Sequence, residues 1–199
     1  MPAHYFSRTQ TVPSQPFEIR ATVRGRDVRL MSDRGVFSAT RLDRGTRLLL
    51  ETAEFRPGEA VLDLGCGYGV VGVFAGLEGA GQVVMVDINP RAAGLAHRNL
   101  EAHGLAEVAL AMVADGASAL GCAWADTCLL NPPIRAGREV VRSLIEGGGG
   151  CLKPGGRLLL VARTSQGVKS LAKVMTECLS QVEEIAKGGG FRVLGGTAS

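Results

Sequence analysis

The sequence of 199 residues predicts an α/β fold, in which a mostly parallel β-sheet is covered by helices on both faces. Two observations favour this class. From residue 60 onward, short apolar runs of strand length alternate with longer segments that have helical spacing of apolar residues. In addition, 46% of the residues are hydrophobic but only 5% are aromatic, as expected for a core of Val, Leu and Ala. The length is that of one compact domain.

Residues 1–56 are expected to form a hairpin and helix extension, before a core that covers residues 57–199. Residues 17–31, FEIRATVRGRDVRLM, alternate apolar and polar residues around a central RGRD, which is typical of a β-hairpin. Its two expected faces are Phe17, Ile19, Ala21 and Val23 on one side, and Arg20 and Arg24 on the other. A helix is expected from about Gly45 to Glu54, with Asp43 as its cap.

The core is expected to alternate strands and helices. The expected strands are 60–65, 82–87, 107–115, 126–131, 156–162, 182–187 and 191–195. The expected helices are 70–80, 89–104, 136–147 and 165–181. Pro90 near the start of one helix and Gly104 beyond its end follow the usual asymmetry of helix termini. The run Gly147–Gly150 is expected to be a frayed helix end or a mobile loop.

The distribution of charge suggests a possible partner. Residues 1–56 carry ten arginines and six acidic residues, whereas the remainder carries twelve basic and thirteen acidic residues. A basic N-terminal portion can face a polyanion, so we expect its hairpin and helix to contact RNA phosphates. The alternative is an ordinary solvated surface.

Several classes are disfavoured. The polar N-terminus MPAHYFSRTQ does not resemble a signal peptide, and no uncharged apolar run approaches the roughly 20 residues of a membrane span. The five cysteines contain no C-x-x-C pair, so reduced thiols fit better than a zinc site. We therefore expect a cytoplasmic protein without a metal. The histidines His4, His97 and His103 receive no catalytic role.

The glycine-rich segment VLDLGCGYGVVG matches two templates. Gly67, Gly69 and Gly72 spell the G-x-G-x-x-G dinucleotide fingerprint, while Asp63, Gly65, Gly67 and Gly69 spell D-x-G-x-G-x-G, the signature of S-adenosylmethionine (SAM) sites. A pyrophosphate prefers bare N–H groups without a nearby carboxylate. SAM carries a sulfonium and an amino group, so a carboxylate there is favourable. This favours SAM over NAD.

Acidic residues also end the next two strands. Asp87 is suited to accept hydrogen bonds from both ribose hydroxyls, and Asp115 to accept from the adenine amino group. The expected cofactor contacts are Asp63, Gly65, Cys66, Gly67, Gly69, Asp87, Ile88, Asp115, Gly116 and Asn131.

Asn131 ends the fourth strand of the core and is followed by Pro132 and Pro133, which hold the chain extended. The carboxyl ends of central parallel strands line the ligand crevice, so this motif should lie beside the cofactor. An amino group on a heteroaromatic ring or an amide is a poor nucleophile. Two acceptors, the Asn131 side-chain oxygen and the Pro132 carbonyl, favour its pyramidal geometry and stabilise the developing positive charge. The alternative is a simple turn.

Ile134 occupies a position where many enzymes with this motif have Tyr or Phe that stacks on the target ring. Here it would form an apolar pocket wall together with Pro133. Phe37 and Phe191 are candidates for the missing stacking surface, but for both we expect a place in the core.

The motifs DLGCGYGVVG, VDINPRA, NPPIRAG and LKPGGRLLLV together resemble the methyltransferase small domain family, which includes RsmC-like and RlmG-like enzymes that methylate the guanine 2-amino group in ribosomal RNA. HYFS, GVFSATRLDRGTRLLL and SLAKVM…GGGFRVL are similar to short stand-alone members. The resemblance implies a seven-stranded class I (Rossmann-like) methyltransferase fold, SAM as methyl donor, and Asn131, Pro132 and Pro133 in the substrate pocket. Because only about 55 residues precede the SAM motif, we expect this chain to lack the extra N-terminal domain of the longer enzymes, and a homodimer is one possible substitute for it.

The expected function is therefore SAM-dependent N-methylation of an exocyclic amine, guanine N2 in ribosomal RNA, with Asn131, Pro132, Pro133 and Ile134 at the reacting centre. Alternatives are methylation of protein glutamine N5 or of adenine N6. A non-catalytic RNA-binding protein with the same fold is an alternative of another class, and an NAD oxidoreductase is more distant.

Overall fold

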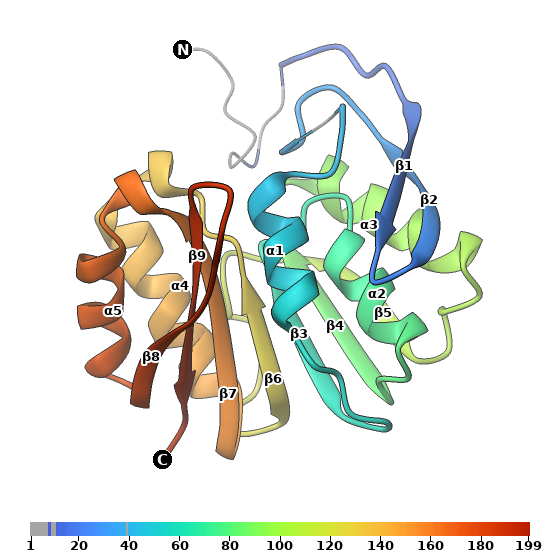
Figure 1. Cartoon of the computed structure of the whole chain (residues 1–199). Coiled ribbons are helices and arrows are strands. Elements are labelled where there is room, and N and C mark those ends of the chain that lie inside the picture. The colour runs from blue at the N-terminus through green and yellow to red at the C-terminus, as the bar shows by residue number, and fades with distance from the viewer. Residues whose placement is uncertain (1–7, 9–10, 39) are drawn as a thin grey trace.

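The computed structural model describes residue 8, residues 11–38 and residues 40–199. His4 and the HYFS segment lie outside these described residues. Within them, seven strands form one sheet in the order β5-β4-β3-β6-β7-β9-β8 (Figure 1). The strands are β3 Ala60–Leu64, β4 Gln82–Asp87, β5 Ala109–Val113, β6 Ala125–Leu130, β7 Leu152–Arg163, β8 Ser180–Gly188 and β9 Phe191–Thr197. The pairs from β5 to β7 are parallel, whereas β9 runs antiparallel to both of its neighbours.

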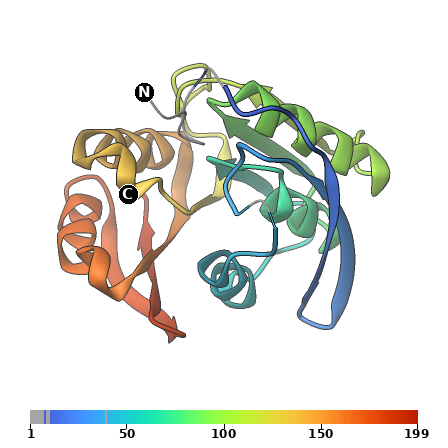
Figure 2. The same ribbon diagram turned by 90° about the horizontal axis from the view of Figure 1, so that it is seen from above.

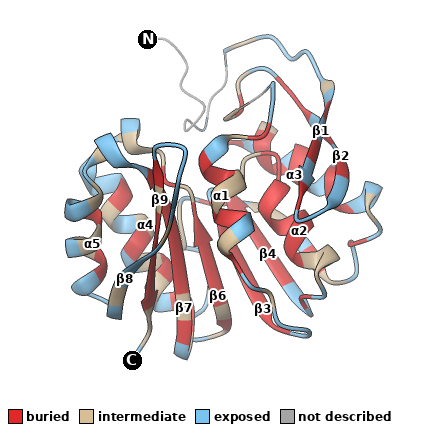
Figure 3. Ribbon diagram, in the orientation of Figure 1, coloured by how far each residue is buried: buried red, intermediate tan, exposed pale blue. Residues whose placement is uncertain are grey.

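Helices cover both faces of this sheet, which confirms the predicted α/β class (Figure 2). The helices are α1 Arg44–Thr52, α2 Val70–Leu77 and α3 Pro90–Ala102 on one face, and α4 Arg138–Cys151 and α5 Val168–Thr176 on the other. Successive side chains along a strand point to opposite faces. Val61 therefore joins the core under α2, while Leu62 and Leu64 join the core under α4. The central strands of the sheet are buried along most of their length (Figure 3).

The predicted N-terminal hairpin is present as β1 Phe17–Val23 and β2 Arg26–Ser32. Its apolar face is buried in the same core as α2 and α3. Arg20 faces solvent as expected. Arg24, however, lies in the turn with φ +52° and donates to the Ala53 carbonyl, 2.8 Å away, instead of joining the outer face of the strand. The two-residue turn Arg24–Gly25, with φ positive at both positions, explains this difference.

One buried amide joins the hairpin to the glycine-rich loop. Asn99 of α3 is 1% exposed; its Oδ1 accepts from the Met31 N–H at 2.7 Å, and its Nδ2 donates to the Met31 carbonyl at 2.9 Å. The same Nδ2 donates to the Tyr68 carbonyl at 2.7 Å. The hairpin, α3 and the loop after β3 are therefore held together through a single side chain.

The glycine run 147–150 is neither a frayed end nor a loop, because α4 continues through it to Cys151. Packing accounts for this. A Cβ on Gly148 would lie 3.0 Å from Cys128 Sγ and 3.1 Å from Leu158 Cδ1, so glycine lets the helix approach the sheet closely.

Other differences concern the ends of elements. The last helix is shorter than expected: residues 164–166 form a 3₁₀ turn, and β8 already begins at Ser180. Conversely, β7 is longer than expected and begins at Leu152. Within the described part of the chain, no helix has the length and apolar character needed to cross a membrane.

Candidate active site

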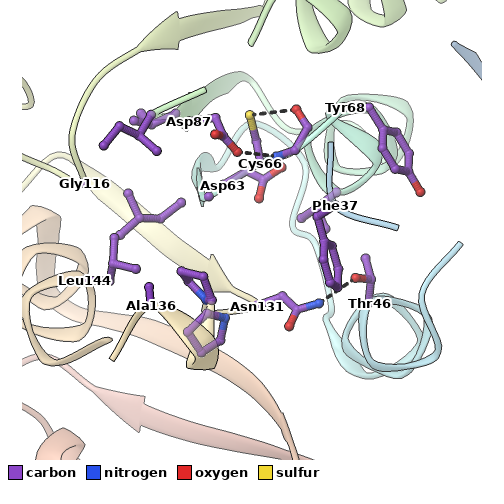
Figure 4. A pocket seen from close by; sticks show the side chains of 18 of the residues that line it. Phe37, Thr46, Asp63, Cys66, Tyr68, Asp87, Gly116, Asn131, Ala136 and Leu144 are labelled. Carbon is purple, nitrogen blue, oxygen red and sulfur yellow. Dashed lines mark hydrogen bonds between the residues drawn. The ribbon is translucent and has the colours of Figure 1, made fainter. Parts of the chain in front are cut away.

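A cavity of roughly 330 Å³ opens at the carboxyl ends of β3, β4 and β6 (Figure 4). Most of the residues proposed from the sequence line it: Asp63, Gly65, Cys66, Gly67, Asp87, Ile88, Asp115, Gly116, Asn131, Pro132 and Pro133. They come from separate segments, which the parallel sheet brings together at the carboxyl ends of its strands. Gly69 and Ile134 are the two proposed residues that do not line it.

The loop after β3 presents bare backbone to the cavity. Gly65 and Gly67 have φ of +79° and +57°, which favours glycine. A Cβ at either position would meet no protein atom within 4 Å, so a side chain there would enter open space. The loop is tied to β4, because the Gly65 and Cys66 N–H groups both donate to the Val86 carbonyl. A ligand can therefore approach this backbone closely.

Gly69 has a different reason to be glycine. It caps the N-terminus of α2 with φ +87°, and a Cβ there would lie 2.8 Å from Ala96 Cβ in α3. Gly69 therefore allows α2 to pack against α3, and its contact with the cofactor stays a prediction.

Asp63 separates the two ligand classes that the glycine pattern left open. Its Oδ2 accepts from the Gly72 N–H, 3.1 Å away, in the first turn of α2. This N–H is thus occupied by a carboxylate, where a dinucleotide would place its pyrophosphate. Burial and the nearby Asp87 raise the pKa of Asp63 to about 7, while the Gly72 hydrogen bond opposes the rise. A buried carboxylate in a cavity favours a cationic ligand.

Asp87 is held rigidly at the end of β4. Its Oδ2 accepts from the Gly67 N–H at 2.9 Å, and its Oδ1 accepts from the Asn89 N–H at 2.8 Å. Burial raises its pKa. Each carboxylate oxygen keeps a second lone pair, so the group can still accept hydrogen bonds from a ligand. Asp115, by contrast, is exposed at the rim of the cavity.

Asn131 lies at the end of β6 with its amide nitrogen directed towards the start of α1 (Figure 4). Its Nδ2 donates to Thr46 Oγ1 at 2.9 Å and is 3.3 Å from Asp43 Oδ2. Oδ1 is consequently the end of the carboxamide that remains to accept a hydrogen bond. The Pro132 carbonyl accepts from the Ile134 N–H at 2.9 Å and retains one lone pair.

The structure places the apolar side chains of Ile134, Phe37 and Phe191 as follows. Ile134 begins a 3₁₀ turn and packs against the core under α4, because the chain turns back after the two prolines. Phe37 lines the cavity together with Thr46 and Asn131 instead of joining the core (Figure 4). Phe191 is buried as expected, 7% exposed and covered by the Arg163 guanidinium at 4.8 Å.

Further lining residues were not singled out from the sequence: Ser38, Thr46, Leu49, Leu64, Tyr68, Val70, Val71, Val86, Ala114, Ala136, Val140 and Leu144. Most are apolar residues of helices and strands whose patterns give no functional signal. Among the described residues, no group of three or more His, Cys, Asp or Glu is placed to hold a metal ion.

Several known proteins are similar to this chain in sequence and in fold. The family profile "Methyltransferase small domain" matches residues 27–195. The Bacillus subtilis protein YbxB, described as uncharacterized, is 32% identical over 98% of both chains. The ribosomal RNA small subunit methyltransferase C of Pseudomonas syringae is 35% identical over 80% of this chain and 48% of its own.

Among solved structures, the T. thermophilus 16S rRNA N2 methyltransferase RsmC, in complex with AdoMet and guanosine, superimposes with a TM-score of 0.82. It is 27% identical, and the match covers 96% of this chain and 52% of that one. The chain thus spans about half the length of these RsmC relatives.

The fold is that of a class I, SAM-dependent methyltransferase. The chain belongs to the methyltransferase small domain family.

Proposed function

We propose that the protein methylates an exocyclic amine of an RNA base, guanine N2 in ribosomal RNA, with Asn131 as the residue that orients the amine. The observation that carries this is the orientation of the Asn131 carboxamide. Its nitrogen is occupied by Thr46 and Asp43, so its oxygen is the acceptor offered to a substrate.

The cofactor would lie between the glycine loop and the acidic strand ends. Asp63 would attract the positive charge of the cofactor, and Asp87 would accept hydrogen bonds from its ribose hydroxyls. Gly65 and Gly67 would allow the cofactor to approach the backbone closely. When bound, SAM supplies an electrophilic methyl group on sulfur and leaves as the neutral thioether.

The chain's own residues would activate the amine. Asn131 Oδ1 and the second lone pair of the Pro132 carbonyl would accept its two N–H bonds, which favours a pyramidal nitrogen. As the nitrogen–methyl bond forms and the carbon–sulfur bond breaks, these oxygens would stabilise the positive charge on nitrogen. The extra proton then passes to water. Phe37, beside Asn131, supplies an aromatic surface on which a base can stack.

RNA as the substrate is supported by the names of the RsmC relatives and by the charge around the cavity. Two segments that contribute lining residues to the cavity, 40–46 through Thr46 and 131–140 through Asn131 and its neighbours, carry four exposed arginines: Arg41, Arg44, Arg135 and Arg138. Within the described part of the chain, none of the four forms an ion pair. The same two segments contain the acidic residues Asp43 and Glu139, so arginines outnumber acids in both of them, and Asp115 is a further exposed acid that lines the cavity.

The hairpin arginines are less suited to this role than the sequence suggested. Arg20 pairs with Glu18, and Arg26 pairs with Glu78 at the C-terminal end of α2. α2 runs back along the sheet after β3, so this end of α2 lies towards the amino ends of the strands (Figure 1), whereas the cavity lies at their carboxyl ends. A seven-residue strand is roughly 23 Å long, so the hairpin turn is distant from a base held at Asn131.

The first test identifies the product. RNA from cells with and without the gene is digested to nucleosides and analysed by mass spectrometry, and RNA from the deletion strain is methylated in vitro. We expect N2-methylguanosine to be missing in the deletion strain and restored by the protein.

Asn131→Ala should lower the rate on the order of a hundredfold or more. Label that persists in protein after RNase digestion would favour glutamine methylation, and N6-methyladenosine would favour the adenine alternative. RNA binding without methyl transfer or SAM binding would favour the non-catalytic reading.

The second test locates the RNA surface. Arg135→Gln/Arg138→Gln should weaken RNA binding and reduce the slope of log affinity against log salt by about 2. Arg20→Gln/Arg26→Gln is the matched control, with the same loss of charge, and should change neither. A larger effect of the hairpin variant would move the RNA surface there, and flat salt dependence in all proteins would remove RNA as the substrate.

A further inference from the structure

The start of α1 lies against Asn131, although the two segments are more than 80 residues apart in the chain. Asp43 is the N-cap of this helix, and its Oδ2 accepts from the Thr46 N–H at 3.0 Å. The same oxygen is 3.3 Å from Asn131 Nδ2. The Thr46 side chain is 6% exposed, and its hydroxyl accepts from Nδ2 at 2.9 Å.

These two contacts determine which way the carboxamide faces. A hydroxyl both donates and accepts, so Thr46 alone would tolerate either end of the Asn131 amide. An ionised carboxylate only accepts, so Asp43 tolerates only the nitrogen. With Nδ2 committed to both groups, Oδ1 is directed to the other side of the carboxamide.

A glycine allows this approach. A Cβ on Gly45 would lie 2.8 Å from the Phe191 ring, so a larger residue would push the first turn of α1 away from β9. The segment LDRGT therefore places a cap, a small residue and a hydroxyl where each is needed to bring α1 against Asn131.

We propose that Asp43 and Thr46 are positioning residues that hold the Asn131 carboxamide with Oδ1 towards the substrate. This inference rests on the proposed role of Asn131. The opposing explanation is structural only: Asp43 caps a helix, Thr46 fills space, and Asn131 would keep its orientation without them.

The variants are chosen to separate these explanations. Thr46→Val keeps the branched shape but removes the hydroxyl, and Thr46→Ser keeps the hydroxyl. Asp43→Ser keeps an N-cap but withdraws the carboxylate from Asn131, whereas Asp43→Asn can place an oxygen at the shared position. We expect Thr46→Val and Asp43→Ser to lower kcat on the order of tenfold to a hundredfold, with SAM affinity unchanged. Thr46→Ser and Asp43→Asn should retain most of the activity.

A double-mutant cycle tests whether the effect passes through Asn131. In an Asn131→Ala background, Thr46→Val should cause no further loss of kcat, because there is no carboxamide left to orient. An equal additional loss in both backgrounds would show a purely structural role and would overturn the inference.

A second readout does not depend on activity. The chain contains three asparagines, so ¹⁵N-asparagine labelling gives three side-chain NH₂ signals, and the Asn131 pair is the one that disappears in Asn131→Ala. In Thr46→Val and Asp43→Ser this pair should shift and exchange its protons faster, while the pairs of Asn89 and Asn99 stay in place. An unchanged Asn131 pair would overturn the inference.

The failures can be told apart. If Asn131→Ala retains full activity, the proposed function of Asn131 is wrong. If Asn131→Ala is inactive but Thr46→Val has the kcat of the natural protein, only the positioning role is wrong.

Discussion

Asp63→Asn is expected to stabilise the ligand-free protein while weakening its affinity for SAM. Asp63 is 4% exposed, and its pKa is raised from 3.8 to about 7 by burial and by Asp87. A shift of one pKa unit corresponds to about 1.4 kcal/mol, so ionised Asp63 costs the folded state on the order of 4 kcal/mol above pH 7. Asparagine keeps an oxygen for the Gly72 N–H but carries no charge.

The gain should depend on pH in a defined direction. Between about pH 4 and pH 7 the native state holds a proton on Asp63 that the unfolded chain has lost. The stability contributed by protonated Asp63 is therefore complete below pH 4 and is lost as the pH rises through about 7. If Asn recovers half of the cost, about 2 kcal/mol, Tm should rise by roughly 4–8 °C at pH 8. The difference should shrink towards pH 4.

Two assays on ligand-free protein check this reasoning: thermal unfolding from pH 5 to 8.5, and calorimetric titration with SAM. In the natural protein, SAM affinity should rise with pH through about 7 as Asp63 ionises, relative to the same titration of Asp63→Asn. Comparing the two proteins cancels any titration of the ligand itself. An Asp63→Asn protein with lower Tm at pH 8, or with unchanged SAM affinity, would refute the argument.

Three further predictions concern other positions. Gly67→Ala should weaken SAM binding at least tenfold by calorimetry, because the added methyl group enters the cavity. Gly104→Ala is the control: Gly104 also has a positive φ and no atom within 4 Å of an added Cβ, but it lies outside the cavity. Both variants should carry the backbone strain of about 1–2 kcal/mol, and only Gly67→Ala should lose SAM affinity. In urea unfolding, Gly148→Ala should destabilise by about 1–3 kcal/mol through overpacking against Cys128 and Leu158, whereas Gly150→Ala, with open space, should stabilise by up to about 1 kcal/mol. Phe37→Leu should raise KM for RNA severalfold without changing SAM affinity if a base stacks there, and an unchanged KM would place the base elsewhere.

The sequence was informative about the sheet and the acidic strand ends because both follow simple rules. Strands with period-two or continuous apolar patterns stand out, and parallel strands must bring their carboxyl ends to one edge. Asp63, Asp87 and Asn131 could therefore be assigned to one site from the sequence alone, and all three line the cavity.

Other features depend on contacts between distant segments and leave no local pattern. Glycines 147–150 are poor helix formers in isolation, yet α4 includes them because Gly148 fits against β6 and β7. The direction of Ile134 follows from the turn after the prolines, and the place of Phe37 from the path of the chain before α1. The hydrogen-bond partners of Asn131 also leave no local pattern in the sequence, because only the folded chain brings Thr46 beside it.

The hydrogen bonds of Asn99, which join α3 to the hairpin and to the glycine-rich loop, limit how far the chain can be truncated from its N-terminal side. A fragment starting at residue 57 would lose the Met31 backbone groups to which both ends of this amide are hydrogen-bonded, and would expose the surface of α3 that now packs against β2. It would also loosen the support of Tyr68, which borders the cavity. The hairpin therefore supports α3 and the glycine-rich loop beside the cavity, and we expect that its removal would destabilise both.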